Sequence, residues 1–285
     1  MATAIAQSAL YGRVVQLQVG GLLWDQQRIR FKIKKTLRRE PNEATITISN
    51  LSAESRRIVT DRGTPVVLRA GYASNIATIY SGQVFTFEDE RNDTERDLTL
   101  TCRDGDSAWL GYVSQSWGAG VPRLTVATAL AAEMGLTLAS GSADLIAANG
   151  STRGPYVAHG HAFEELDDFL RPLGLSWSIQ DGMLQVIAAN ASNGQSAVLL
   201  TPQTGLIGVP KRMEKYHKPG SKNHGTPTQV EFQSLLQPSL VPGRQVRLES
   251  DAITGNYIVQ VAEFSGDTHS DDWTVTCQGA EVANV

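Results

Sequence analysis

The sequence contains little cysteine, little charge and no long apolar run. Two cysteines in 285 residues exclude a disulfide framework and a four-cysteine zinc site. The 25 Lys and Arg residues are outnumbered by 29 Asp and Glu residues, which gives a formal net charge of -4. This balance argues against a nucleic-acid-binding protein, whose phosphate contacts need clustered cations. No run of roughly 18 apolar residues occurs, so the sequence predicts no spanning helix and no membrane insertion.

The amino-terminal residues also lack the features of a secretory signal peptide. Residues 1–10 read MATAIAQSAL, without a basic segment ahead of an apolar one. We therefore expect a chain that is made, and meets its partners, in the cytoplasm. The length and an apolar fraction of 41% predict a globular protein of about two domains, each able to bury its own core.

Apolar and polar residues alternate in the first and last thirds of the sequence, which is typical of strands with one buried face. A short helix is expected at residues 51–60, with Ser52 as its N-cap. The middle of the chain instead has helical patterns at residues 124–134 and 161–170. It also has an Asp-Gly pair, Asp181-Gly182, between two short alternating runs, which predicts a β-hairpin.

These patterns predict a mainly β protein. Two related β-barrel or sandwich domains, residues 1–115 and 193–285, are expected to flank a small α+β insert at residues 116–192.

The relation between the two β domains is an internal repeat. Three blocks match with identical internal spacing: Gly63, Val66 and Leu68 with Gly243, Val246 and Leu248; Tyr80, Val84 and Phe87 with Tyr257, Val261 and Phe264; and 98–102 with 273–277. Length differences fall only between the blocks, where turns are expected. The alternative is chance agreement between two β meanders, but alternation alone does not place Gly, Tyr, Phe and Cys at matching positions. The repeat predicts that Cys102 and Cys277 occupy one core position twice, as buried thiols rather than a disulfide.

No residue pattern indicates catalysis. The sequence has no nucleophile elbow, Walker loop or dinucleotide-binding fingerprint. His159 and His161 could ligate a metal from one strand face, but no third ligand lies near them, so structural histidines are preferred. The acidic residues at 164–168 suit the start of a helix, and the acidic loop 266–272 lacks calcium-loop spacing. We predict no catalytic, cofactor-binding or metal-binding residues and no enzyme activity.

The clearest charge feature is a cluster of cations within which Glu214 is the only acidic residue: Lys211, Arg212, Lys215, Lys218 and Lys222. The cluster is our candidate for contact with a partner, either an acidic protein surface or a nucleic acid. An exposed flexible loop is the alternative, which the neighbouring Pro and Gly residues favour. Because aromatic residues are scarce among these cations, nucleic-acid binding is the weaker interpretation.

Several motifs resemble bacteriophage tail baseplate hub proteins. Pro41–Leu51 (PNEATITISNL), Ala70–Tyr72 (AGY) and Ile79–Gly82 (IYSG) resemble the first tube-like domain of that family. Leu236–Gly243 (LQPSLVPG) resembles part of the second tube-like domain of that family, and Thr204–Pro210 (TGLIGVP) resembles the segment that leads into it. The likeness extends over most of the chain and is weakest in its middle.

The resemblance implies a homotrimeric ring at the distal end of a tail tube, in the virion baseplate. Two related β domains in each of three subunits would give a pseudo-six-fold ring between a six-fold tube and a three-fold spike. Edge strands would pair or abut across subunits. Expected partners are a tail tube or distal tail protein, the spike protein, the tape-measure protein and baseplate wedge proteins. DNA would pass through the lumen without specific binding, which suits the net negative charge.

Two functions of other classes remain as alternatives. One is a tail-associated cell-wall hydrolase with the insert as its catalytic domain, which the lack of separated catalytic carboxylates disfavours. The other is a receptor-binding or glycan-binding tail module, for which a surface aromatic cluster would be the distinguishing feature.

Overall fold

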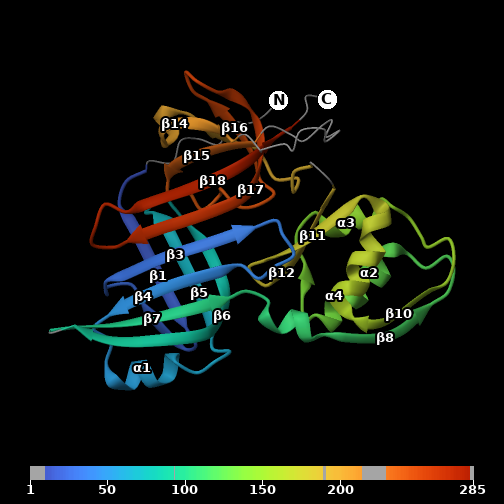
Figure 1. Ribbon diagram of the computed structural model, residues 1–285, viewed down its shortest axis with the longest axis horizontal. Coiled ribbons are helices and arrows are strands. Elements are labelled where there is room, and N and C mark those ends of the chain that lie inside the picture. The colour runs from blue at the N-terminus through green and yellow to red at the C-terminus, as the bar shows by residue number, and fades with distance from the viewer. Residues whose placement is uncertain (1–9, 93, 189–190, 214–228, 283–285) are drawn as a thin grey trace, which may run out of the picture.

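The computed structural model describes residues 10–92, 94–188, 191–213 and 229–282. A large β part, formed by the two ends of the chain, lies beside a smaller α+β part formed by the middle (Figure 1). The mainly β fold predicted from the sequence is confirmed. In the described part of the chain, no helix is long and apolar enough to cross a membrane.

The amino-terminal third forms seven strands and one helix. Their bounds are β1 Arg13–Val19, β2 Leu22–Trp24, β3 Ile29–Thr36, β4 Glu43–Ser49, α1 Ala53–Val59, β5 Pro65–Tyr72, β6 Asn75–Asn92 and β7 Glu95–Arg103. Buried and more exposed residues alternate along β3, β4 and β7, as the sequence pattern predicts. Helix α1 begins after Ser52, whose side chain accepts a hydrogen bond from the backbone N of Ser55.

The carboxy-terminal third adds six strands and a short 3₁₀ helix. Their bounds are β13 Val198–Leu200, η3 Pro202–Thr204, β14 Leu206–Met213, β15 Gln229–Leu235, β16 Gln245–Glu249, β17 Thr254–Asp267 and β18 Trp273–Glu281. These strands and those of the first third make one 13-stranded sheet with a shared hydrophobic core. The main path of the sheet is β14-β15-β18-β17-β3-β4-β7-β6-β5-β1-β2, and β16 and β13 branch from β17.

The predicted repeat is present in the topology of this sheet. Strands β3 to β7, the first copy, are ordered β3-β4-β7-β6-β5, and strands β14 to β18, the second copy, are ordered β14-β15-β18-β17-β16. The five strands of each copy, numbered along the chain, thus have the same order in the sheet. The next position differs, because β1 runs antiparallel to β5 whereas β13 runs parallel to β16.

Two glycines fix how the copies correspond. Gly63 and Gly243 have nearly equal positive φ angles of 85° and 86°, a region that favours glycine. Each donates its N–H to a strand residue, Gly63 to the carbonyl of Val84 and Gly243 to that of Val259. A β-bulge follows each of these two valines, so Val84 and Val259 are equivalent.

This correspondence corrects the predicted equivalence of the cysteines. Cys102 lies opposite Val84, and Gly279 lies opposite Val259, so Gly279 is the equivalent of Cys102. Cys277 is instead equivalent to Leu100. The predicted alignment of this block was wrong by two residues. A two-residue shift keeps every side chain on its face, so the predicted burial holds: both thiols are free and fully buried. Burial raises the pKa of Cys102 to about 12.

The insert has a hydrophobic core of its own, which extends from Ala108 to Val186. Its elements are η1 Asp106–Leu110, β8 Tyr112–Trp117, α2 Arg123–Glu133, β9 Thr137–Leu138, α3 Ser142–Ala147, β10 Tyr156–His161, α4 Ala162–Leu170, η2 Arg171–Leu173, β11 Leu175–Gln180 and β12 Met183–Ala188. The predicted hairpin is β11–β12, and its turn residues Asp181 and Gly182 both have positive φ. The domain bounds 1–115, 116–192 and 193–285 stay a prediction.

Candidate functional site

The two copies meet inside the chain where the outer half of β17, residues 261–267, pairs antiparallel with β3. We call this pairing the internal junction. On its buried face, Phe264 lies opposite Ile33, and each is only 1% exposed. On its other face, Glu263 lies 3.5 Å from the Nζ atom of Lys34. The junction therefore combines hydrogen-bonded backbone, apolar packing and opposite charge.

An ion pair closes the end of the internal junction. Asp267 lies 2.8 Å from a guanidinium nitrogen of Arg28, which precedes β3. The hydrogen bond from Arg28 lowers the pKa of the Asp267 carboxyl, as does the hydrogen bond from the backbone N of His269. The acidic loop 266–272 thus forms the end of the β17–β18 hairpin, and its first carboxylate, that of Asp267, helps to join the copies.

The equivalent part of the first copy has no such partner. The outer half of β6, residues 86–91, pairs with β7 on one side. Strand β5 pairs with β6 only at residues 75–83, so in the described chain no strand borders the other side of this outer half. All six residues, Thr86-Phe87-Glu88-Asp89-Glu90-Arg91, are exposed, including Phe87 at 48%. An open strand edge of this kind is a site for pairing with another chain.

Strand β14 is another open edge of the sheet, as are β2 and β13. Within the described residues it pairs only with β15, and a bulge lies between Ile207 and Lys211. Of the predicted cationic cluster, Lys211 and Arg212 lie on this strand and are exposed. The other three cations, Lys215, Lys218 and Lys222, lie outside the described residues. The structure thus places part of a predicted contact surface on a sheet edge.

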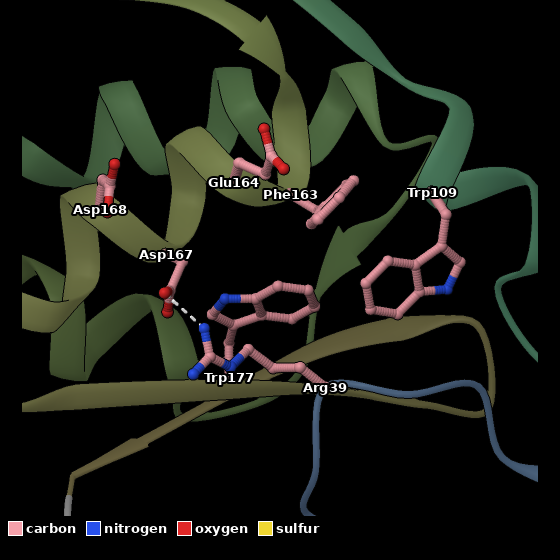
Figure 2. A pocket seen from close by; sticks show the side chains of 7 residues that line it. All are labelled: Arg39, Trp109, Phe163, Glu164, Asp167, Asp168 and Trp177. Carbon is pink, nitrogen blue, oxygen red and sulfur yellow. Dashed lines mark ion pairs between the residues drawn. The ribbon is translucent and has the colours of Figure 1, made fainter.

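A pocket of about 420 Å³ lies where the insert meets the β part (Figure 2). Aromatic rings form one side of it, with Trp109 centred 5.0 Å from Phe163 and 5.8 Å from Trp177. The indole nitrogens of both tryptophans are buried and have no hydrogen-bond partner. The remaining lining residues are charged: Arg39, Glu164, Asp167 and Asp168.

Helix α4 provides the acids of this pocket, and they make local contacts. Asp167 forms an ion pair with Arg39, which reaches across from the turn after β3 (Figure 2). Asp168 lies 2.5 Å from Arg171. Aromatic rings beside carboxylates, here tilted against one another, can bind a sugar ring through CH–π contact and hydrogen bonds from its hydroxyl groups.

A buried polar network attaches the tip of the β11–β12 hairpin to the β part. Lys35 on β3 is fully buried, and its Nζ donates to both carboxylate oxygens of Asp181, at 2.7 and 2.6 Å. The same carboxylate accepts a hydrogen bond from the backbone N of Ser81 on β6. A buried charge needs such pairing because its desolvation is costly. The sequence indicated Asp181 only as a turn residue, because its partners are distant in the chain.

Asp104, which follows β7, lies fully buried in the same network. Its carboxylate accepts hydrogen bonds from the backbone N and the Nδ2 of Asn42, at 2.7 and 2.9 Å. Burial raises the pKa of Asp104 to about 6, although the hydrogen bonds from Asn42 oppose this shift.

Comparison with known proteins identifies the class of molecule. A sequence profile of the baseplate hub gp41 family matches residues 14–279. The chain belongs to this family. It is therefore a β-rich structural component of a virion tail. No curated protein matches its sequence.

Solved structures share the fold of this hub protein at low sequence identity. A tail protein from Neisseria meningitidis MC58 is 14% identical with a TM-score of 0.65, over 95% of this chain and 97% of that one. The 43 kDa tail protein of prophage MuSo2 from Shewanella oneidensis is 8% identical with a TM-score of 0.66, over 95% and 98%. An Escherichia coli type VI secretion component, described as similar to T4 tail proteins gp27 and gp5, is 11% identical with a TM-score of 0.61, over 94% and 77%.

The histidines singled out in the sequence lie on β10 of this hub protein. The Nε2 of His159 lies 3.1 Å from the hydroxyl of Tyr112, and its Nδ1 lies 3.3 Å from that of Ser114. His161 stacks on Phe163. These contacts join His159 to β8 and His161 to α4. Across the described ranges, no three His, Cys, Asp or Glu residues form a group that could hold a metal ion.

Proposed function

We propose that three copies of this hub protein form a ring in which six similar β units surround a channel. The observation that carries the proposal is the repeat of one five-strand order within the chain, with the two copies joined edge to edge. Three chains of two units each match a six-fold tail tube on one side and a three-fold spike on the other. A head-to-tail contact that closes after three subunits makes such a ring.

The ring would conduct DNA and the tape-measure protein without holding them. One face of β3, β4, β7 and β17 suits this role, because Thr47 and Thr99 hydrogen-bond each other there and most of its cations, though not Lys32, are paired with acids. These pairs include Lys34 with Glu263 and Arg103 with Glu43. A wall of neutral and paired groups offers phosphates few free cations.

The proposed partners follow from the position of the ring in the baseplate. They are a tail tube or distal tail protein above, a spike protein below, the tape-measure protein inside and wedge proteins outside. The ring would assemble in the host cytoplasm and then stay in the virion.

The mass of the purified protein in solution tests the ring. Light scattering over a concentration series should give three times the chain mass, and negative-stain images should show rings with a central channel. A chain that stays monomeric at high concentration, even with the spike protein added, would contradict the proposal.

One specific observation favours a second function. The aromatic pocket of Trp109, Phe163 and Trp177 is the kind of cluster that a glycan-binding tail module requires. Titration with host cell-surface oligosaccharides would then change tryptophan fluorescence in the wild type but not in Phe163→Ala. We expect no such change, because Arg39 already occupies the acidic side of the pocket. Peptidoglycan suspensions should also keep their turbidity, since a hub needs no hydrolytic activity.

A further inference from the structure

We propose that the outer half of β6 in one subunit pairs antiparallel with β14 of the next subunit, repeating the internal junction between chains. The inference rests on the proposed ring and adds to it the two strands, their register and the charged residues that meet. The starting point is that β17 and β3 pair at the internal junction, whereas the equivalent strands, the outer half of β6 and β14, each have an unpaired edge in the described chain.

The equivalence of the strands gives the pairing. The bulges after Val84 and Val259 make the outer half of β6 equivalent to the outer half of β17. In each copy the first strand, β3 or β14, pairs with the second strand, β4 or β15, so β14 is equivalent to β3. Since the outer half of β17 pairs with β3 inside the chain, the outer half of β6 is built to pair with β14. The β14 available to it belongs to another subunit.

The register of the internal junction then gives the pairs of residues. Within the chain, Ser265 lies opposite Lys32. The equivalent of Ser265 in β6 is Glu90, because each lies four residues beyond the aligned start of its outer half. The equivalent of Lys32 in β14 is Lys211, because Lys32 lies opposite Thr45 of β4 and Lys211 opposite Glu231, its counterpart in β15. Glu90 of one subunit is therefore expected to face Lys211 of the next.

Neighbouring positions extend this charge complementarity. The same register places Asp89 opposite Arg212, and Glu88 opposite Met213. Acidic residues thus follow one open edge and basic residues the other, which favours contact between unlike edges over contact between two copies of the same edge. Asp89 already lies 2.6 Å from Arg96 within its own subunit. The pair of Glu90 with Lys211 is therefore the sharper test.

Burial supports the same assignment. In the second copy, Ala262 and Phe264 lie at the internal junction, belong to the shared core and are at most 1% exposed. In the first copy, Phe87 holds the position of Ala262 and is 48% exposed. A bulky apolar side chain on an open strand edge invites aggregation unless a partner covers it. Pairing with β14 would place Phe87 against the next subunit.

Cysteine pairs test the register directly. In Glu90→Cys with Lys211→Cys, oxidation should produce covalent dimers and trimers on a non-reducing gel, because directly opposed residues lie within disulfide reach. The native thiols do not interfere, since Cys102 and Cys277 are both buried. The matched control is Glu90→Cys with Arg247→Cys, whose second position is exposed on β16, away from the proposed contact. It should stay uncrosslinked.

Charge exchange tests the energetics of the contact. Glu90→Lys should raise the concentration needed for half-maximal trimer about tenfold, and so should Lys211→Glu. The chain with both substitutions should recover most of the loss, because opposite charges then face each other again at this pair. Circular dichroism on each variant checks that the exposed substitutions leave the fold intact.

The outcomes separate this contact from the ring itself. The strand pairing would be overturned, and the ring would stand, if the wild type is a trimer, charge reversal leaves its assembly unchanged and the double-cysteine variant gives no crosslink between positions 90 and 211. A wild-type monomer would overturn both. Crosslinking together with recovery by the exchange of Glu90 and Lys211 would support the pairing in its proposed register.

Discussion

In the second copy the outer half of β17 lies between β18 and β3, whereas in the first copy the outer half of β6 has only β7 beside it. The two strands share their bulge and their place in the sheet order, and yet one carries Ala262 and Phe264 where the other carries Phe87 and Asp89. Equivalent backbones have thus acquired different surroundings. The two copies therefore share a backbone arrangement, whereas the polarity of the side chains at equivalent positions depends on whether the neighbouring unit lies in the same chain.

Truncation on the buried side of this comparison should have the greatest consequence. Phe264→Ala should lower the free energy of unfolding by about 3–5 kcal/mol, because it leaves a cavity in the shared core. At the equivalent position of the first copy, Asp89→Ala removes an ion pair near the surface and should cost about 1 kcal/mol or less. Urea denaturation at one fixed protein concentration measures both, since the stability of an assembly depends on concentration. Equal losses would contradict the comparison.

The next effect concerns the strand ends. Asp104 is fully buried after β7, whereas its equivalent in the second copy, Glu281, is exposed at the end of β18. Burial raises the pKa of Asp104 from 3.8 to about 6. The native state then keeps a proton that the unfolded chain has lost, so this group makes the free energy of unfolding fall as pH rises from about 4 to 6. The fall attributable to Asp104 is roughly 3 kcal/mol.

Substitution isolates this contribution. In Asp104→Asn the pH-dependent fall is absent, so the stability difference between wild type and variant should shift in favour of the variant by that amount between pH 4 and 7. Thermal and urea unfolding at several pH values give the difference. Glu281→Gln is the matched control, and its difference from wild type should stay nearly constant. Parallel curves for Asp104→Asn and wild type would show that the buried carboxyl does not titrate in this window.

A weaker effect is expected for an element that only one copy has. Helix α1 lies between β4 and β5, whereas the connection from β15 to β16 contains no helix. Ser52→Ala removes the N-cap and should cost about 1 kcal/mol, while Ser52→Asp keeps an acceptor and should stay close to wild type. Because α1 lies outside the repeated strands, neither variant should change the mass of the assembly. A lost trimer in Ser52→Ala would give α1 a role in subunit contact.

Local patterns predicted the local structure of this chain well. The N-cap at Ser52, the hairpin at Asp181-Gly182 and the helices α2 and α4 of the insert follow from neighbouring residues, whereas the short helix α3 was not predicted. The repeat was also found, but its second block (Tyr80 to Phe87 with Tyr257 to Phe264) and its third block (98–102 with 273–277) were each misaligned by two residues. Alternation repeats every two residues, so it cannot detect such a shift. The bulges that set the true register leave no mark in the apolar pattern.

The candidate site was harder to predict because it depends on distant segments. Lys211 and Arg212 were predicted from charge alone to contact a partner, but nothing in the neighbouring sequence indicated that they lie on an open strand edge. The pairing of Lys35 with Asp181 joins residues that are 146 positions apart. Such contacts become visible only when the fold brings the segments together.

The bulges have a mechanical consequence. Beyond Val259 the strand β17 leaves β16 and continues along β3, so a single backbone belongs to two adjacent units. A pull on one unit is then passed to the other through covalent chain and a row of hydrogen bonds loaded in shear, rather than through side-chain contacts. A wall built from such shared strands would stretch or twist as one body when the tail is under load.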